Sequence, residues 1–186
     1  MVAITGPVGT GKSYVALYLA CKLDPAFQKV QTEEEAYELL KNRIIRHPTE
    51  LISLIDEKKL KRGSVVIFDE AGTSIDSRQW FSFNNKIIRY ILQTFRYKQL
   101  ITIFTLPSLT FLDAQARRAI EFYIETMAIN FNEKVSTSWV RRFQANPRSG
   151  EIYRKRPKYI VNGELQSYDQ LKWPRPRRLI AKTYEK

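Results

Sequence analysis

The sequence predicts an α/β fold in which helices flank a central, mainly parallel sheet. Short apolar or β-branched runs, such as residues 2–5 and 65–68, have the composition of buried strands. Longer segments with apolar residues at helical spacing lie between such runs. Strands that alternate with helices along a chain form parallel sheets. A glycine-rich loop joins the first strand to the first helix, and it is typical of this fold class.

The first half of the chain is divided by signals that begin or end helices. Asp24-Pro25 ends the first helix, and His47-Pro48 ends a later one. Thr32 has the position of a helix cap, with Glu35 as its capping-box partner. These signals predict a helix at 14–23, a strand at 27–30, and helices at 33–46 and 50–60.

The second half begins with an apolar strand at 65–68. A helix at 83–98 is expected because Ile87, Ile91 and Phe95 recur four residues apart. Next come a strand at 100–104, a short helix at 113–120, a strand at 119–130, a β-hairpin at 135–159 and a tail with too many prolines for regular structure. We therefore divide the chain into a core, residues 1–130, and a C-terminal hairpin and basic tail packed on it, residues 131–186.

Residues 6–13, GPVGTGKS, match the phosphate-loop pattern G-x-x-x-x-G-K-[ST] without substitution. Its glycines permit backbone conformations in which consecutive N–H groups wrap a polyphosphate. Lys12 adds a positive charge for the β- and γ-phosphates, and the Ser13 hydroxyl is suited to ligate Mg²⁺. The motif predicts a RecA-like P-loop NTPase core with ATP and Mg²⁺ as cofactors. The nucleotide-binding residues are then Gly6, Pro7, Val8, Gly9, Thr10, Gly11, Lys12, Ser13 and Tyr14.

Two adjacent acids, Asp69 and Glu70, follow the apolar strand at 65–68. A buried strand has no use for two carboxylates unless a group at its end requires them, because uncompensated buried charge is costly. Asp69 is expected to hold the Mg²⁺ shell, and Glu70 to polarise the attacking water as the catalytic base. The pair favours an ATP hydrolase over a phosphotransferase, which has no need of a base that activates water.

Positive charge is concentrated in the C-terminal part of the chain. The net charge is +12, and residues 147–186 hold eleven Lys/Arg against four Asp/Glu. Such an excess is typical of proteins that bind a polyanion, most often nucleic acid. We expect the DNA contacts to come from the predicted hairpin, namely from Arg141, Arg142, Arg154, Lys155, Arg156 and Lys158. Docking of a capsid or membrane protein on this basic surface is the alternative.

Cys21 is the single cysteine, which excludes a disulfide or zinc framework within the chain. The longest weakly polar run, residues 100–112, is interrupted by polar residues and is too short to span a bilayer. The phosphate-loop motif begins almost at Met1, which leaves no room for a signal peptide. We therefore expect a soluble cytoplasmic protein.

Taken together, residues 2–125 resemble the FtsK/HerA superfamily of DNA-pumping ATPases. The resemblance is greatest to the genome-packaging ATPases of membrane-containing icosahedral viruses and to the Zot-like ATPases of filamentous phages. Beyond the two nucleotide motifs, it rests on residues 92–98, LQTFRYK, and 104–108, FTLPS.

The resemblance implies roles for further residues. Thr105, at the tip of its strand, takes the place of the γ-phosphate sensor, where the family commonly has glutamine. Arg96 best matches the arginine finger that one subunit supplies to the next; Arg78, Arg89, Arg117 and Arg118 are the other candidates. The resemblance also implies a ring of six subunits around double-stranded DNA. If the protein is viral, it implies a place in the host cytoplasm and an association with the virion.

Three rival functions remain open at this point. A Zot-like phage-extrusion ATPase usually carries a transmembrane span, which this sequence lacks. A P-loop nucleotide kinase would need an arginine-rich lid and has no obvious use for Asp69-Glu70. An AAA+ remodeller shares the G-P-x-G-T-G-K-[ST] loop but is expected to need a C-terminal helical lid, whereas residues 135–186 are predicted to be rich in strands and proline.

Overall fold

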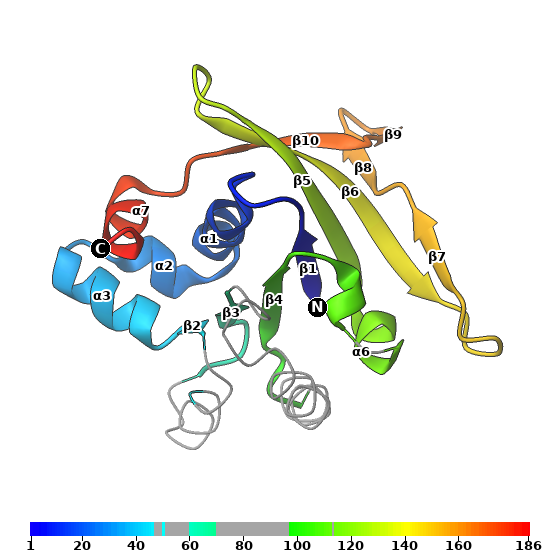
Figure 1. Cartoon of the computed structure of the whole chain (residues 1–186), viewed down its shortest axis with the longest axis horizontal. Coiled ribbons are helices and arrows are strands. Elements are labelled where there is room, and N and C mark those ends of the chain that lie inside the picture. The colour runs from blue at the N-terminus through cyan, green and yellow to red at the C-terminus, as the bar shows by residue number, and fades with distance from the viewer. Residues whose placement is uncertain (47–49, 51–59, 70–96, 113) are drawn as a thin grey trace.

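The computed structural model describes residues 1–46, 50, 60–69, 97–112 and 114–186. Its strands are β1 (Val2–Thr5), β2 (Ile44–Ile45), β3 (Val65–Phe68), β4 (Ile101–Leu106), β5 (Phe122–Asn130), β6 (Val135–Ala145), β7 (Ile152–Lys155), β8 (Lys158–Val161), β9 (Glu164–Ser167) and β10 (Gln170–Pro174). Within these residues, eight strands form one sheet in the order β10-β6-β5-β1-β4-β3-β2, with β7 also paired to β6 (Figure 1). The strands β8 and β9 pair separately.

The sheet has a parallel part and an antiparallel extension. The strands β5, β1, β4, β3 and β2 pair in parallel, as predicted. Next to them, β6 pairs antiparallel with β5, and the far edge of β6 carries β10 and β7. The division proposed at residues 130/131 falls in the connection between β5 and β6, so the extension continues the core sheet.

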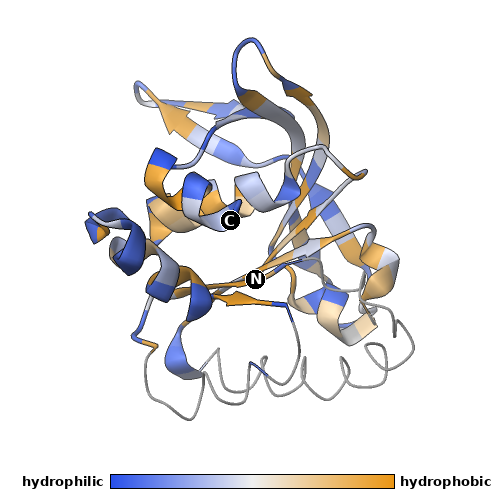
Figure 2. Cartoon of the chain, turned by 60° about the vertical axis from the view of Figure 1, so that its left-hand side comes forward, coloured by the Kyte–Doolittle hydropathy of each residue, from blue (hydrophilic) through white to orange (hydrophobic). Residues whose placement is uncertain are grey.

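Both faces of the parallel part are buried. In β4, Phe104 and Leu106 belong to one apolar cluster, and Ile103 belongs to the other. The same alternation holds in β1, where Ala3 and Ile4 point to opposite clusters. Side chains alternate between the faces of a strand, so these runs serve two layers of packing. Figure 2 shows the hydrophobic residues gathered along the strands.

Among the described residues, the helices are α1 (Lys12–Leu23), α2 (Pro25–Lys29), α3 (Glu33–Lys41), α6 (Ala114–Ala119) and α7 (Arg178–Tyr184), with a 3₁₀ turn at Leu109–Phe111. The strand predicted at 27–30 is wrong, since α2 occupies most of this segment. Asp24 caps α2 by accepting a hydrogen bond from the Ala26 N–H, and Pro25 fits the first helical position. The aspartate that ends α1 therefore also begins α2.

The next helix begins where it was predicted and ends early. The Thr32 hydroxyl accepts from the Glu35 N–H, and the Glu35 carboxylate accepts from the Gln31 N–H. The prediction extended this helix to residue 46, but α3 ends at Lys41 and Ile44–Ile45 forms β2. The two β-branched residues extend the parallel sheet by pairing with β3, which overrides the continuation of the helix.

The C-terminal residues are more regular than predicted. The hairpin of β6 and β7 is confirmed, but Lys158 lies in β8, outside it. The tail forms β10 and α7, although it was expected to be irregular. Pro174 is tolerated because it ends a strand at the outer edge of the sheet.

The last helix, α7, packs beside α1 and α3, so the C-terminal end of the chain returns to the first helices (Figure 1). Glu33 at the start of α3 accepts from Lys182 and Lys186. These two ammonium groups lower the pKa of Glu33 to about 2. Arg177 donates to the carbonyls of Phe27, Gln28 and Val30 at distances of 2.6–3.0 Å.

The helices predicted at 50–60 and 83–98 lie largely outside the described residues, as do Glu70 and Arg96. None of the described helices is long and apolar enough to cross a membrane.

Replacing Arg177 with alanine should lower the free energy of unfolding by about 1–2 kcal/mol, because three carbonyls at the end of α2 lose a charged donor. Urea unfolding followed by circular dichroism measures this. The neighbouring Arg178→Ala removes the same charge from an exposed position and should change stability by less than about 0.5 kcal/mol. Equal effects of the two substitutions would refute the assigned role of Arg177.

Candidate functional site

The phosphate loop connects β1 to α1, and its glycines have positive φ angles. At Gly6, φ is 145°, and an added Cβ would lie 2.3 Å from the Thr126 hydroxyl. At Gly11, which precedes α1, φ is 88°, and a Cβ would meet Ile129 at 3.3 Å. Gly6 therefore requires glycine for conformation and for space, and Gly11 requires it for conformation.

The N-terminus of α1 is suited to bind an anion. Its cap, Gly11, makes no side-chain capping bond, and its first turn holds no acidic residue. By contrast, α3 begins with the Thr32 cap and three glutamates. The first N–H groups and the positive dipole end of α1 are thus left for a ligand. The Lys12 ammonium lies over the loop, where it donates to the Gly6 and Pro7 carbonyls at 2.9 and 2.8 Å.

Strands β5 and β6 hold the loop from the side. The hydroxyls of Thr10 and Thr126 lie 2.6 Å apart, and Thr10 donates to the Pro7 carbonyl. The Thr126 hydroxyl donates to the Thr5 carbonyl, and Ser136 donates to the Thr10 carbonyl. The contacts of Thr126 and Ser136 with the loop were not predicted from the sequence. A signal existed for Ser136, since a small polar residue on the buried face of a strand needs a partner.

Asp69 follows β3, and its carboxylate is buried, with 3% of the residue exposed. Its Oδ1 accepts from the Ser13 and Thr105 hydroxyls, each at 2.8 Å. The structure therefore brings the two predicted metal residues, Ser13 and Asp69, into direct contact. Because β4 lies between β1 and β3, Thr105 is beside Ile4 of β1 and its hydroxyl reaches the carboxylate.

A third hydroxyl reaches Asp69 from the end of the chain. The Tyr184 phenol of α7 donates to Asp69 Oδ2. Burial and the neighbouring carboxylate raise the pKa of Tyr184 to about 12, so the phenol stays a hydrogen-bond donor at neutral pH. Local sequence carries no signal for this contact, because it depends on where α7 packs.

The residues present fit a magnesium-bound polyphosphate. The glycine loop, the open N-terminus of α1 and Lys12 suit the phosphates. The oxygens of Ser13 and Asp69 are hard ligands of the kind that Mg²⁺ prefers. Such a cradle is typical of enzymes that bind nucleoside triphosphates.

The family comparison agrees with this geometry. The model of the "ATPase family associated with various cellular activities (AAA)" matches residues 2–126. The chain belongs to the AAA family. It is therefore a P-loop ATPase, and membership implies nucleotide binding. This membership corrects the expectation that residues 135–186, which were predicted to be rich in strands and proline and to lack a helical lid, count against an AAA protein.

The two other comparisons add little. No curated protein matches the chain. Among solved structures, the N-terminal domain of zonular occludens toxin from Neisseria meningitidis is similar at a TM-score of 0.38 and 15% identity, covering 82% of this chain and 91% of that domain. We draw no argument from similarity at this level. The FtsK/HerA resemblance stays a prediction.

The predicted DNA-contact residues are distributed over several positions. Arg142 and Lys155 are opposite each other in the β6–β7 hairpin and are exposed. Arg141 and Arg156 both pair with Asp169, at 2.7 and 3.0 Å. Strand alternation separates Arg142 from Arg141, so the predicted residues do not form one continuous surface.

Arg154 and Arg117 line a pocket of about 650 Å³, together with Gly6 and Pro7 of the phosphate loop. Two guanidinium groups of the same chain thus face the space beside the loop. Arg118, by contrast, lies against Gly150 of the hairpin turn, where a Cβ would come within 2.5 Å of its Nη2.

Thr105→Val should lower the free energy of unfolding by about 1–3 kcal/mol, because the buried Asp69 carboxylate loses one of its donors. Thermal and urea unfolding measure this. Thr105→Ser keeps the hydroxyl and should cost only the lost methyl group, about 1 kcal/mol. If serine proves as costly as valine, the hydrogen bond to Asp69 is not what makes Thr105 important.

Proposed function

We propose that this protein is an ATP-driven DNA translocase that packages double-stranded DNA into a viral capsid. The proposed ATP-driven activity rests on the contact of Ser13 and Thr105 with Asp69, beside an open phosphate loop. The proposed action on DNA rests on the basic hairpin and on the net charge of +12.

ATP hydrolysis needs a metal residue, a phosphate cradle and a base. Ser13 and Asp69 would hold Mg²⁺, which neutralises charge on the phosphates. Glu70 directly follows Asp69 in the sequence, and we assign it the role of polarising the attacking water. Thr105, whose hydroxyl now donates to Asp69, is positioned to respond when the metal or the γ-phosphate is lost.

The hairpin carries a pair of like charges that supports a polyanionic partner. Arg142 and Lys155 are direct cross-strand neighbours. Like charges at such positions destabilise a hairpin, and a bound phosphate between them would remove that cost. Asp169 already compensates Arg141 and Arg156, so we assign the main phosphate contacts to Arg142 and Lys155, which share one face of the hairpin.

Assembly into a ring completes the proposal. The resemblance to ring-forming DNA pumps supports it, with Arg96 of one subunit serving the site of the next. A motor of this kind would act in the cytoplasm of the host cell, at the capsid.

Lys12→Ala should abolish nucleotide binding, whereas Glu70→Gln should bind ATP normally and fail to hydrolyse it. Only the first substitution damages the phosphate cradle; the second removes the base. Calorimetry with ATP and Mg²⁺ measures binding, and phosphate release measures turnover. Hydrolysis by Glu70→Gln at the wild-type rate would refute the assigned base.

DNA binding should be indifferent to sequence and should weaken steeply with salt, because a motor holds phosphates and not bases. The double variant Arg142→Ala/Lys155→Ala should reduce the slope of log K against log salt by up to about 1.8 and reduce DNA-stimulated hydrolysis, with ATP affinity unchanged. Fluorescence anisotropy with duplex DNA measures the slope.

The control is Lys29→Ala/Lys41→Ala, which removes the same charge from exposed positions on α2 and α3. A slope that changes equally in both double variants would show only a general charge effect. An unaltered slope with intact DNA stimulation in Arg142→Ala/Lys155→Ala would favour a capsid or membrane protein as the partner of the hairpin.

A further inference from the structure

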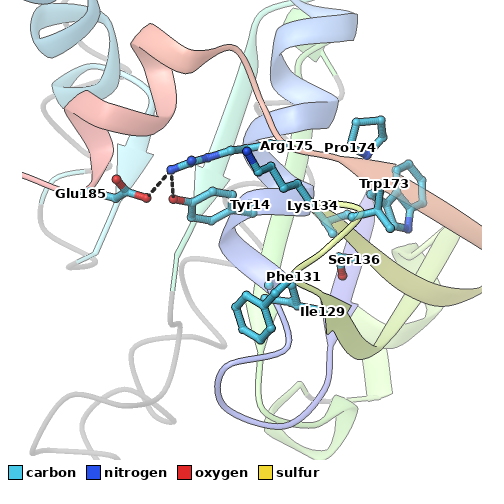
Figure 3. A pocket seen from close by; sticks show the side chains of 12 residues that line it. Tyr14, Ile129, Phe131, Lys134, Ser136, Trp173, Pro174, Arg175 and Glu185 are labelled. Atoms are coloured by element: carbon cyan, nitrogen blue, oxygen red, sulfur yellow. Dashed lines mark hydrogen bonds and ion pairs between the residues drawn. The ribbon is translucent and has the colours of Figure 1, made fainter.

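A second pocket adjoins the phosphate loop at Gly11 and Tyr14, and its volume is about 310 Å³. Its lining is mostly apolar and comes from the β5–β6 connection and from β10 (Figure 3). The apolar and aromatic side chains are those of Val15, Ile129, Phe131, Val135, Trp173 and Pro174. The charged ones are those of Lys134, Arg175 and Glu185.

The position of this pocket follows from the order of the strands. Asp69 lies after β3, which is two strands from β1 on one side. The pocket is lined by the β5–β6 connection and β10, on the other side of β1. A polyphosphate in the loop between them would have its metal-bound end toward Asp69. Its other end, which carries the nucleoside, would then leave past Gly11 and Tyr14.

We propose that this pocket binds the adenine base of ATP. The inference rests on the proposed ATPase function and adds the residues that hold the base. An apolar, partly aromatic pocket with few polar groups is the environment that a flat heterocycle occupies in proteins. Phe131 lies at the rim, 80% exposed, where its ring can cover the base. Stacking of a base on an aromatic ring is favourable for any base.

Two of the charged residues, Arg175 and Glu185, pair with each other at the pocket. Arg175 donates to Glu185 at 3.0 Å and to the Tyr14 phenol at 3.3 Å, as the dashed lines in Figure 3 show. These contacts join β10, α1 and the end of the chain. The base would then contact the apolar walls of the pocket, which include Ile129 and Trp173.

Most of this pocket is built by residues that the AAA family model does not match. The model ends at residue 126, whereas the aromatic walls, Phe131 and Trp173, come later in the chain. The C-terminal residues are therefore part of the nucleotide site, in addition to any contact with DNA.

The test compares the affinities of the full chain for ATP and for inorganic tripolyphosphate, each with Mg²⁺, by calorimetry. We expect ATP to bind more tightly, since only ATP has a base. Phe131→Ala should weaken ATP binding by about 5-fold or more, the lower range for a base stacked on an aromatic ring, and leave tripolyphosphate binding unchanged. The matched control is Phe122→Ala, at the opposite end of β5 and 41% exposed, which should change neither affinity.

Photolabelling with 8-azido-ATP, followed by peptide mapping, identifies directly the residues that lie beside the bound base. We expect labelled residues within 129–136 or 173–175, with labelling lost when unmodified ATP is added in excess. If ATP binds no tighter than tripolyphosphate, if Phe131→Ala has no effect, or if the label lies elsewhere, the pocket assignment is wrong and the ATPase proposal stands. If neither ligand binds, and Lys12→Ala behaves like the wild type, both proposals are wrong.

Discussion

The buried carboxylate of Asp69 is the group on which the arrangement of the site depends. Its two oxygens accept hydroxyl hydrogen bonds from α1, β4 and α7, through Ser13, Thr105 and Tyr184. A carboxylate removed from water must be compensated, and here the compensation comes from elements far apart in the sequence. The same oxygens would face Mg²⁺ in a nucleotide complex. The hydroxyls occupy three of the roughly four acceptor sites of the carboxylate, so a bound metal would share Asp69 with the network that includes α7.

The antiparallel extension of the sheet serves the phosphate loop. A P-loop needs glycines with positive φ, which are flexible in an unfolded chain and costly to order. The hydrogen bond from Ser136 to the Thr10 carbonyl and the contact of the Thr10 and Thr126 hydroxyls fix the loop against β5 and β6, and Ile129 packs beside Gly11. The loop is thus held before any ligand arrives. Binding of a polyphosphate then costs less conformational entropy, since the N–H groups are already oriented.

Local patterns predicted the parallel sheet and the phosphate loop because both are encoded by short, contiguous residues. The loop motif, the buried strand before Asp69 and the Thr32 cap all depend on neighbours within a few positions. The prediction of a helix through Ile44–Ile45 failed because these residues pair with β3 instead. The prediction of a strand at 27–30 failed because Asp24, which ends α1, also caps α2. Tyr184 could not be predicted at all, since its role depends on the return of the chain to α1 and α3.

The C-terminal segment lies at both ends of the nucleotide cradle. Tyr184 reaches the carboxylate at the metal end, and Trp173 and Arg175 line the pocket at the other end. Glu185, which pairs with Arg175, directly follows Tyr184 in the chain. A shift of α7 that frees Asp69 for a metal would therefore also move Glu185, and with it the Arg175 side chain beside the pocket. Coupling of this kind needs no long pathway, because Tyr184, the last residue of α7, and Glu185, which follows it, contact both ends. In an ATPase that cycles between bound and empty states, it would let the two ends of the site change together.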